Sequence, residues 1–596
     1  MENNIQSRLA RLRAAMTANG VNAVIIPQSD PHQSEYLASH WQVRRFLSGF
    51  SGSAGWLVVT ADKALLWTDS RYFIQASLQL RDTGIELMKE GIPGTPSIVD
   101  WLVAELPASS VVAIDGLLVS AEWVAQNAPR FTANGLLLMT DFDVIDDIWT
   151  DRPALPSCPV IIHDEKYAGE SARSKIDLVL ANAADARATS VLLSALDEIA
   201  WTLNLRSRDV AYNPVMTSFL YLDSAGASTL FVDDAKLTPE VRAHLDAAGV
   251  ATAPYDSLTG FLAALPADAR VLVTPALTAA TIVNILGDRA VKAPSPVALS
   301  KGCKNAVQIR GIHDAMVRDG VALVGAMMEI ERRIAEGRLT ELDVADILRD
   351  HRSRQALYFD ESFGTIAGWG PHGAIVHYEA DAESSSLISG DNLLLIDSGA
   401  QYLDGTTDIT RTIAVGTPSA QQRHDFTLVM KGHIAMATAI FPEGTHGLQL
   451  DALARQFLWK EGLSYLHGTG HGVGHFLNVH EGPQKISLIY APAPLVPGMV
   501  TSNEPGLYRT DRWGIRCENL TLVVPAMESE EFGRFYKFET LTLFPFDLRL
   551  FDTDIMTDTE IEWVNNYHAM VADRLMPHLD ADGRDWLTDK TRPLSR

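Results

Sequence analysis

The sequence predicts three consecutive domains, two of the α/β class and one of the α+β class. In residues 1–155, helical patterns such as SRLARLRAAMTANG alternate with short apolar runs such as VNAVIIP and AGWLVVT. This alternation is typical of a sheet covered by helices, and a similar order begins again after residue 155. Residues 301–596 instead open with long helical patterns and continue with paired strand-like segments, which predicts an α+β domain.

Local composition indicates where the domains end. The Pro-rich segment DRPALPSCP, residues 151–159, is typical of a linker and closes a first domain of residues 1–155. Residues 171–205 then repeat the helix and strand order of the first domain, which indicates an internal duplication, although any two α/β domains share such an order. The segment APSPVALSKGCKN ends the second domain, residues 156–300, and the third comprises residues 301–596.

Composition excludes several classes of protein. The chain has 596 residues, 47% of them hydrophobic, and a net charge of −25, the wrong sign for a protein that coats nucleic acid. Its three cysteines lie far apart, which favours a reducing cytoplasm over a disulfide framework or a zinc ribbon. No uncharged apolar run approaches the ~18 residues that span a bilayer. We therefore expect neither nucleic acid nor a membrane as partner.

The third domain is expected to begin with two helices and to continue with two strand hairpins. Helical patterns cover residues 305–337 and 340–355, and Thr340 is placed to cap the second helix with Asp343 in its first turn. The segment NLLLIDSGAQYLDGTTDITRTIAVG predicts two strands around a turn at Tyr402–Gly405. The segment GMVTSNEPGLYRTDRWGIRCENLTLVVP predicts two more around Thr510–Arg512.

Each predicted hairpin carries two carboxylates, one on each strand, at similar distances from the turn. Asp397 and Asp408 lie almost symmetrically about the first turn, and Glu504 and Glu518 lie symmetrically about the second. Residues that face each other in an antiparallel pair have Cβ atoms ~5 Å apart, where like charges are destabilising. In apolar strands this pattern indicates bound cations. Two divalent ions ~3.5–4 Å apart would neutralise the four negative charges and could catalyse a hydrolysis.

Simpler interpretations exist for single residues. Asp397 alone would more often cap a turn, His377 and His475 would be core histidines, and Arg516 would form a salt bridge with Glu518. The segment HGTGHGVGHFLNVHEGP concentrates four histidines, but its glycines do not fit G-x-G-x-x-G, and neither H-E-x-x-H nor G-x-S-x-G occurs in the chain. An oxygen-rich site with one imidazole favours Mn²⁺ before Zn²⁺.

The ordered motifs IDSGAQYLDGTTDITRT, HGTGHGVGHFLNVHEGP, TSNEPGLY and GIRCENL resemble those of the Xaa-Pro aminopeptidases, also called aminopeptidase P, of the pita-bread metallopeptidase group. The resemblance covers the whole chain. RRFLSGFSGSAG, LLWTDSRYF, DDIWTDRP and ALDEIAWTLNLR resemble the two creatinase-like N-terminal domains of the long, three-domain cytosolic form, and EWVNNYHAMV resembles its C-terminal helix. The resemblance therefore implies two creatinase-like α/β domains before a pita-bread catalytic domain.

The resemblance also implies a set of site residues. It implies a centre of two divalent ions, expected to be Mn²⁺ with Zn²⁺ or Co²⁺ as alternatives, in which Asp408 and Glu518 bridge the ions. The implied ligands are Asp397, Asp408, His471, Glu504 and Glu518. The implied catalytic residues are His377, His467 and His480 around the substrate, Glu504 as the base for a metal-activated bridging water, and Arg516 steadying the carboxylates. His475 is expected to take neither role.

The activity implied is hydrolysis of the Xaa-Pro bond, which releases the N-terminal residue from peptides with proline at the second position. The resemblance also implies a cytoplasmic homodimer. Two alternatives remain open: a prolidase that cleaves only Xaa-Pro dipeptides, and a noncatalytic pita-bread scaffold that binds peptides or proteins. Three arginines of the first domain are candidates to reach the site: Arg44, Arg45 and Arg71. Surface arginines usually only make a face of the protein polar.

Overall fold

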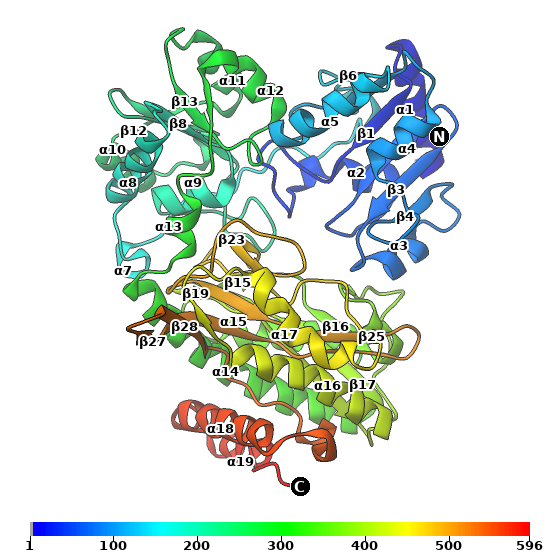
Figure 1. Cartoon of the computed structure of the whole chain (residues 1–596), viewed down its shortest axis with the longest axis vertical. Helices are drawn as coiled ribbons and strands as arrows, with labels where there is room; N and C mark the ends of the chain where they lie inside the picture. The colour runs from blue at the N-terminus through cyan, green and yellow to red at the C-terminus, as the bar shows by residue number, and fades with distance from the viewer. Residues whose placement is uncertain (1–3) are drawn as a thin grey trace. The chain divides into compact units, whose positions relative to one another are not determined.

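The computed structural model describes residues 4–596 and divides them into two compact units (Figure 1). Unit 1 contains the residues up to His163 and Glu170–Val297, and unit 2 contains Asp164–Gly169 and Ala298–Arg596. Within the described residues, every helix is too short or too polar to cross a lipid bilayer. Residues 152–160, in the Pro-rich segment predicted to be a linker, form neither helix nor strand.

The first sheet of unit 1 has the strand order β4-β3-β2-β1-β5-β6. β2 pairs antiparallel with both β1 and β3, and the other neighbours are parallel. The strands are β1 (Ala23–Ile26), β2 (Trp56–Thr60), β3 (Ala64–Thr68), β4 (Glu86–Lys89), β5 (Val111–Ile114) and β6 (Leu137–Met139). The helices are α1 (Ile5–Ala18), α2 (Val43–Ser48), α3 (Phe73–Gln79), α4 (Ile98–Glu105), α5 (Ala121–Ala133) and α6 (Ile145–Ile148).

The second sheet of unit 1 has the order β12-β11-β10-β8-β13-β14 and the same succession of antiparallel and parallel pairs. Its strands are β8 (Ser190–Leu193), β10 (Ser218–Asp223), β11 (Ser228–Val232), β12 (Val250–Ala253), β13 (Val271–Val273) and β14 (Ala290–Lys292). Its helices are α8 (Ala172–Asp185), α9 (Leu196–Leu203), α10 (Pro239–Ala248), α11 (Leu258–Ala264) and α12 (Ala280–Leu286). The repeated order of the sequence is therefore a repeated topology.

Local sequence explains where these elements begin. Ser97, Ser120 and Ser171 cap α4, α5 and α8 by accepting the backbone N–H three residues further on. The central strands β1 and β8 are buried along their whole length, as continuous apolar runs predict. Arg44 is also buried inside unit 1, where its guanidinium donates to Gln28 at 2.9 Å and to the carbonyl of Gly52.

Two capped helices open the larger part of unit 2. Thr340 and Asp343 form a reciprocal capping box at the start of α15, which confirms the predicted cap, and Asn305 and Gln308 do the same for α14. Apolar residues of α14 and α15 pack into one core with the strands that carry the first hairpin. The helices of unit 2 are α7 (Glu165–Ala168), α13 (Ala298–Gly302), α14 (Ala306–Ala335), α15 (Glu341–Ser353), α16 (Ala420–Ala437), α17 (Gly447–Trp459), α18 (Asp558–Leu575) and α19 (Ala581–Lys590).

The strands of unit 2 form sheets with the orders β15-β18-β19, β16-β17-β20, β21-β28-β27-β24-β22-β23 and β25-β26. The strands are β15 (Tyr358–Glu361), β16 (Ile366–Trp369), β17 (Asn392–Ser398), β18 (Ala400–Tyr402), β19 (Gly405–Thr406), β20 (Ile409–Val415), β21 (Ile440–Pro442), β22 (Gly470–Gly472), β23 (Glu481–Ile486), β24 (Val500–Asn503), β25 (Gly506–Arg509), β26 (Trp513–Arg516), β27 (Asn519–Ser529) and β28 (Gly533–Thr540). The predicted α+β character of this region is confirmed.

The first hairpin has the predicted turn and keeps one register from the turn into β17 and β20. Tyr402 pairs with Gly405, so the turn is where the sequence placed it. Asp397 pairs with Thr410 rather than with Asp408, which lies just before β20 and outside the ladder. The prediction that the two aspartates lie nearly opposite each other was wrong by two positions, because the turn is centred between Leu403 and Asp404, one position beyond the midpoint of Asp397 and Asp408.

The second hairpin has the predicted register. Asn503 pairs with Asn519 in one sheet and Gly506 pairs with Arg516 in another, so Glu504 and Glu518 lie opposite each other in the gap between the two ladders. In this gap Glu504 donates its backbone N–H to Thr469 O at 2.8 Å, and Glu518 donates to Thr410 O at 3.1 Å. The break in pairing thus connects the second hairpin to the first.

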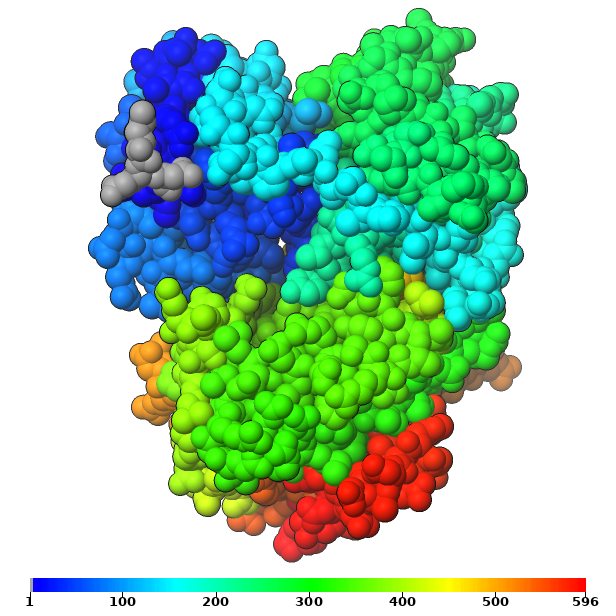
Figure 2. Space-filling model, turned by 180° about the vertical axis from the view of Figure 1, so that it is seen from behind, coloured from blue at the N-terminus to red at the C-terminus, as the bar shows by residue number. Residues whose placement is uncertain are grey.

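The C-terminal helices close one end of unit 2. Figure 2 shows them in red against the long helix α14 in green. From α18, Tyr567 reaches inward, and its hydroxyl lies 2.9 Å from the guanidinium of Arg411. Arg411 is buried and donates to the carbonyl of Glu518 at 2.5 Å, so the end of the chain braces the second hairpin.

A buried ionic network lies behind the first hairpin. Arg352 of α15 is 0% exposed and donates to Asp319 of α14 at 2.9 and 3.1 Å and to Glu361 of β15 at 3.3 Å. Tyr402, at the turn of the hairpin, donates its hydroxyl to Asp319 at 3.0 Å. These contacts fix the position of the hairpin relative to both long helices.

Replacing Arg352 with alanine is expected to lower the free energy of unfolding of unit 2 by about 3–5 kcal/mol, because two buried carboxylates lose their cation. Arg354→Ala is the matched control, since Arg354 and its partner Asp350 have side chains 61% and 64% exposed. The control is expected to change the same free energy by less than about 1 kcal/mol. Urea unfolding followed by tryptophan fluorescence measures both, and equal losses would contradict the assigned network.

Candidate metal centre

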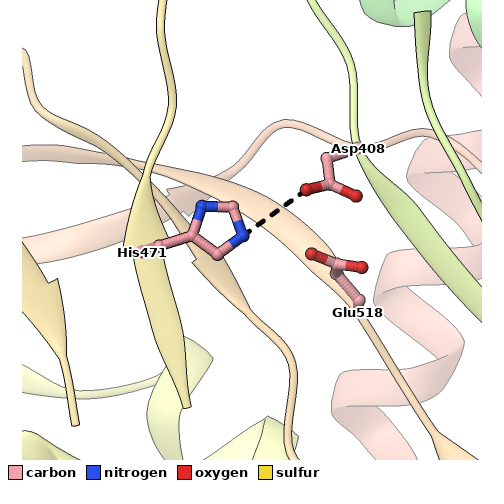
Figure 3. A group of neighbouring side chains, drawn as sticks. All are labelled: Asp408, His471 and Glu518. Carbon is pink, nitrogen blue, oxygen red and sulfur yellow. Dashed lines mark ion pairs between the residues drawn. The ribbon is translucent and has the colours of Figure 1, made fainter. Parts of the chain in front are cut away.

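Acidic side chains from both hairpins converge with one histidine of β22. Figure 3 shows Asp408, His471 and Glu518 pointing toward one another from different segments. Each offers one ligand atom, and these atoms all lie within 4.8 Å of one another. His471 Nε2 lies 3.5 Å from Asp408 Oδ2 and 3.6 Å from Glu504 Oε1. The arrangement brings together residues that are more than a hundred positions apart in sequence.

Hydrogen bonds orient His471 toward the carboxylates. Its backbone N–H donates to Ser502 Oγ at 2.9 Å, which holds β22 against β24 at this position. Its Nδ1 lies 3.0 Å from the carbonyl oxygen of Gly472, which can only accept, so Nδ1 carries the proton. The lone pair is therefore on Nε2, the atom that faces the carboxylates. A metal-binding histidine typically donates a hydrogen bond from the ring nitrogen that does not contact the metal.

The carboxylates are buried, and burial together with neighbouring negative charge raises the pKa of Asp408, Glu504 and Glu518. Burial raises the pKa of Asp408 and of Glu518 well above the usual range, and repulsion from Asp397 and Glu504 adds to the effect. Burial likewise raises the pKa of Glu504 to about 7. Glu518 is 1% exposed and keeps one stabilising contact, a hydrogen bond of 2.7 Å donated by Thr410 Oγ1. Without a cation, the ionised cluster is strongly destabilising.

Asp397 has one satisfied and one unsatisfied oxygen. Its Oδ2 accepts from Arg516 Nη2 at 2.5 Å. Its Oδ1 is buried, and within residues 4–596 it has no hydrogen-bond partner. A buried carboxylate oxygen without a donor is costly unless a cation contacts it. The orphaned oxygen, the lone pair of His471 and the acidic cluster together form a donor set that suits divalent ions.

Arg516 connects the acidic cluster to its surroundings. The sequence offered a salt bridge to Glu518 as the simple interpretation, but the guanidinium pairs with Asp397 instead. It also donates to Thr410 Oγ1 at 3.1 Å, to Tyr508 OH at 2.8 Å and to the carbonyl of Val376 at 3.3 Å. Arg516 is 2% exposed, so it acts inside the protein as a brace between carboxylates and loop.

Tyr508 is a site residue that motif reasoning did not single out, although it ends the quoted motif TSNEPGLY. Its hydroxyl accepts from Arg516 and lies 2.8 Å from His467 Nε2. His467 Nδ1 lies 2.7 Å from the carbonyl oxygen of Gly468, which can only accept, so Nδ1 carries a proton and a neutral His467 would accept at Nε2 from Tyr508. The chain His467, Tyr508, Arg516 and Asp397 is therefore continuous.

The remaining histidines lie at different positions around the cluster. His480 precedes β23, and its ring centroid lies 4.4 Å from that of His471. His377 lies in a turn that follows the short 3-10 helix Gly370–Ala374. It follows Val376, whose carbonyl accepts from Arg516. His475 is 2% exposed and lies in the core.

Comparison with known proteins identifies the family. Residues 311–525 match the model of metallopeptidase family M24, and residues 534–594 match the C-terminal region of peptidase M24. Residues 8–136 and 151–308 each match a creatinase/prolidase N-terminal domain. Aminopeptidase P2 from Arabidopsis thaliana is 42% identical, with 99% of this chain and 89% of the relative aligned. The chain belongs to metallopeptidase family M24.

Two further relatives of this M24 chain extend over its whole length. A probable Xaa-Pro aminopeptidase P from Aspergillus niger is 41% identical, with 99% of both chains aligned. The crystal structure of X-prolyl aminopeptidase from Caenorhabditis elegans, described as a cytosolic enzyme with a di-nuclear active site, matches with a TM-score of 0.95 and 35% identity, over 99% of this chain and 100% of that one. These matches confirm the predicted creatinase-like and pita-bread fold.

Divalent ions are expected to stabilise this M24 protein. An ion present at a hundred times its dissociation constant adds about 2.7 kcal/mol to the free energy of unfolding. Asp408→Asn is expected to raise the stability of the metal-free protein, because it removes one of the repelling charges, and to abolish most of the response to Mn²⁺. Thermal unfolding with chelator and with Mn²⁺ measures both effects.

Asp511→Asn is the matched control for this measurement. Asp511 is an exposed turn residue with φ of 60°, a conformation that asparagine also adopts. It is expected to respond to Mn²⁺ as the parent does. A response of Asp408→Asn equal to that of the control would contradict the assignment of this cluster as a metal centre.

Proposed function

We propose that this M24 metallopeptidase is an Xaa-Pro aminopeptidase that releases the residue preceding a penultimate proline. The observation that carries the proposal is the convergence of buried carboxylates on His471 Nε2 in a chain 42% identical to aminopeptidase P2 along almost its whole length. The match to a structure described as X-prolyl aminopeptidase with a di-nuclear active site supports the same activity.

The proposed ligands of two divalent ions are Asp397, Asp408, His471, Glu504 and Glu518, with Asp408 and Glu518 shared between the ions. The buried orphaned oxygen of Asp397 and the unprotonated Nε2 of His471 support this set. Four carboxylates and one imidazole favour Mn²⁺, with Zn²⁺ or Co²⁺ as alternatives. When bound, two such metal ions supply the Lewis acidity that makes water a nucleophile at neutral pH.

Glu504 is proposed to take the proton of the attacking water. The proposal rests on its place beside His471 Nε2, 3.6 Å from Glu504 Oε1, among the proposed ligands. Ser502 Oγ lies 3.4 Å from Glu504 Oε1, and burial raises the pKa of Glu504 while the charge of Arg516 lowers it. The carboxylate can thus accept and release a proton without leaving its position.

The histidines are proposed to divide the handling of the substrate. His480, beside His471, is proposed to donate to the developing oxyanion, and His377 to deliver a proton to the proline nitrogen that leaves. His467, expected to lie around the substrate, is proposed to orient the Tyr508 hydroxyl and, through Arg516, the carboxylate of Asp397.

Recognition of proline follows from the chemistry of the substrate. The Xaa-Pro bond is a tertiary amide without an N–H, so an enzyme that grips the scissile N–H cannot use it. We propose that this site recognises the proline ring by its shape instead. We further propose a cytoplasmic homodimer. The description of the related structure as a cytosolic enzyme supports the location, and the family resemblance underlies the dimer, which sedimentation analysis tests.

The activity is tested with three classes of peptide. The Mn²⁺-loaded parent is expected to release Xaa from Xaa-Pro-Yaa and to cleave Xaa-Ala-Yaa at least about a hundredfold more slowly, because the proposed function requires recognition of the proline ring. Asp408→Asn serves as the inactive control. Cleavage of the Xaa-Pro dipeptide alone would show a prolidase, and tight binding without any cleavage would show a noncatalytic scaffold.

Tyr508→Phe is expected to lower kcat by about ten- to a hundredfold with a small change in KM, because removing the hydroxyl frees His467 and Arg516 while the ring still packs. Tyr536→Phe is the matched control, since that hydroxyl contacts Glu443 in a hairpin away from the centre. Steady-state kinetics on Xaa-Pro-Yaa gives both values. An unchanged kcat in Tyr508→Phe would remove the residue from the mechanism.

A further inference from the structure

A cavity of about 360 Å³ adjoins the candidate metal centre and continues away from it. His471 and His480 form the wall nearest the ligands, and residues of β23 and the loop after it form the rest. Pro483, Tyr490 and Pro492 supply apolar surface to the same cavity. Its volume lies in the range of cavities that hold small ligands or a few residues of peptide.

Lys485 is the cation of this cavity. It pairs directly with His471 across β22 and β23, so the two side chains leave the same face of the sheet with Cβ atoms ~5 Å apart. Both line the cavity, and Lys485 is half-buried. Within residues 4–596, no carboxylate forms an ion pair with Lys485 and no acceptor receives a hydrogen bond from its ammonium group. An ammonium group in a cavity wall without such a contact is placed to bind a negatively charged ligand.

The wall behind Lys485 carries no free negative charge to neutralise it. Glu481 precedes it on the same strand, but this carboxylate is buried between two other cations. Lys301 Nζ lies 2.8 Å and Lys304 Nζ 2.6 Å from its oxygens, with all three side chains at most 3% exposed. Glu481 is therefore already paired with two ammonium groups and is not the partner of Lys485.

The other end of the cavity differs in charge. The carboxylates around His471 form the donor set for divalent ions, whose charge they would neutralise. Lys485 then remains the charged group that a substrate meets beyond His471 and His480. An extended peptide advances ~3.3–3.6 Å per residue, so one or two residues beyond the proline suffice to reach across the cavity.

We propose that Lys485 forms a subsite that recognises a carboxylate of the peptide on the side that follows the proline. The inference rests on the proposed aminopeptidase function and names a substrate preference of that site. The carboxylate has two sources, the C-terminus of a short peptide and the side chain of an acidic residue after proline. Charge-assisted hydrogen bonds from the ammonium group recognise either one.

Lys485→Met tests the subsite, because methionine retains most of the length and apolar packing of the side chain without its charge. The first pair of substrates is Xaa-Pro-Yaa with a free carboxylate and the same peptide with a C-terminal amide. The second pair is amidated Xaa-Pro-Glu and amidated Xaa-Pro-Gln. The parent is expected to show a KM about three- to tenfold lower for the charged member of at least one pair.

In Lys485→Met the ratio of KM values within that pair is expected to fall to about one with little change in kcat, and in Lys485→Glu it is expected to invert. The pair that responds identifies the source of the carboxylate. Lys537→Met, at an exposed position of β28, is the matched control and is expected to keep the ratios of the parent. Ratios that are the same in the parent, Lys485→Met and the control would overturn the proposal.

Failure of the proposed activity would be recognised separately, since the parent would then cleave none of the four peptides. The same peptides then serve as ligands of the Mn²⁺-loaded parent and of Lys485→Met in titration calorimetry. A weaker affinity of the variant for the charged member alone would still support the subsite. Equal affinities of both proteins for both members would overturn it.

Discussion

Mutual repulsion among buried carboxylates is the constraint on which the rest of unit 2 depends. Asp408 and Glu518 are almost fully buried next to Glu504 and Asp397, and burial together with repulsion raises their pKa values well above the usual range. A fold holds such a group only if rigid elements prevent the side chains from separating and a cation compensates for their charge. The sheets, helices and hydrogen bonds around the centre meet the first requirement, and its donor set is suited to the second.

Rigidity comes from contacts between segments that are distant in sequence. Thr410 of the first hairpin donates to Glu518 and receives a hydrogen bond from Arg516 of the second. Arg411, next to Thr410, ties the backbone of Glu518 to Tyr567 of the C-terminal helix α18. Because each brace joins two or three elements, a change in one alters the position of the ligands carried by the others.

Two similar histidines acquire different chemistry from their neighbours. His471 and His467 both donate a hydrogen bond from Nδ1 to a backbone carbonyl oxygen. In the neutral ring this leaves the lone pair on Nε2. In His471 this lone pair faces carboxylates, whereas in His467 it accepts from the hydroxyl of Tyr508. The function of each ring is thus set by what lies opposite Nε2, which residue type and spacing alone do not reveal.

Sequence alone determined the features that depend on local chemistry: the cap at Thr340, both hairpin turns, the register of the second hairpin and the gathering of acidic residues near one histidine. Tertiary structure decided the turn that carries His377 and the contacts of Arg516, Tyr508 and Lys485. The physical reason is that a turn or a cap forms between residues a few positions apart. A strand that changes sheet, or a side chain that crosses between hairpins, is fixed by packing that no local pattern encodes.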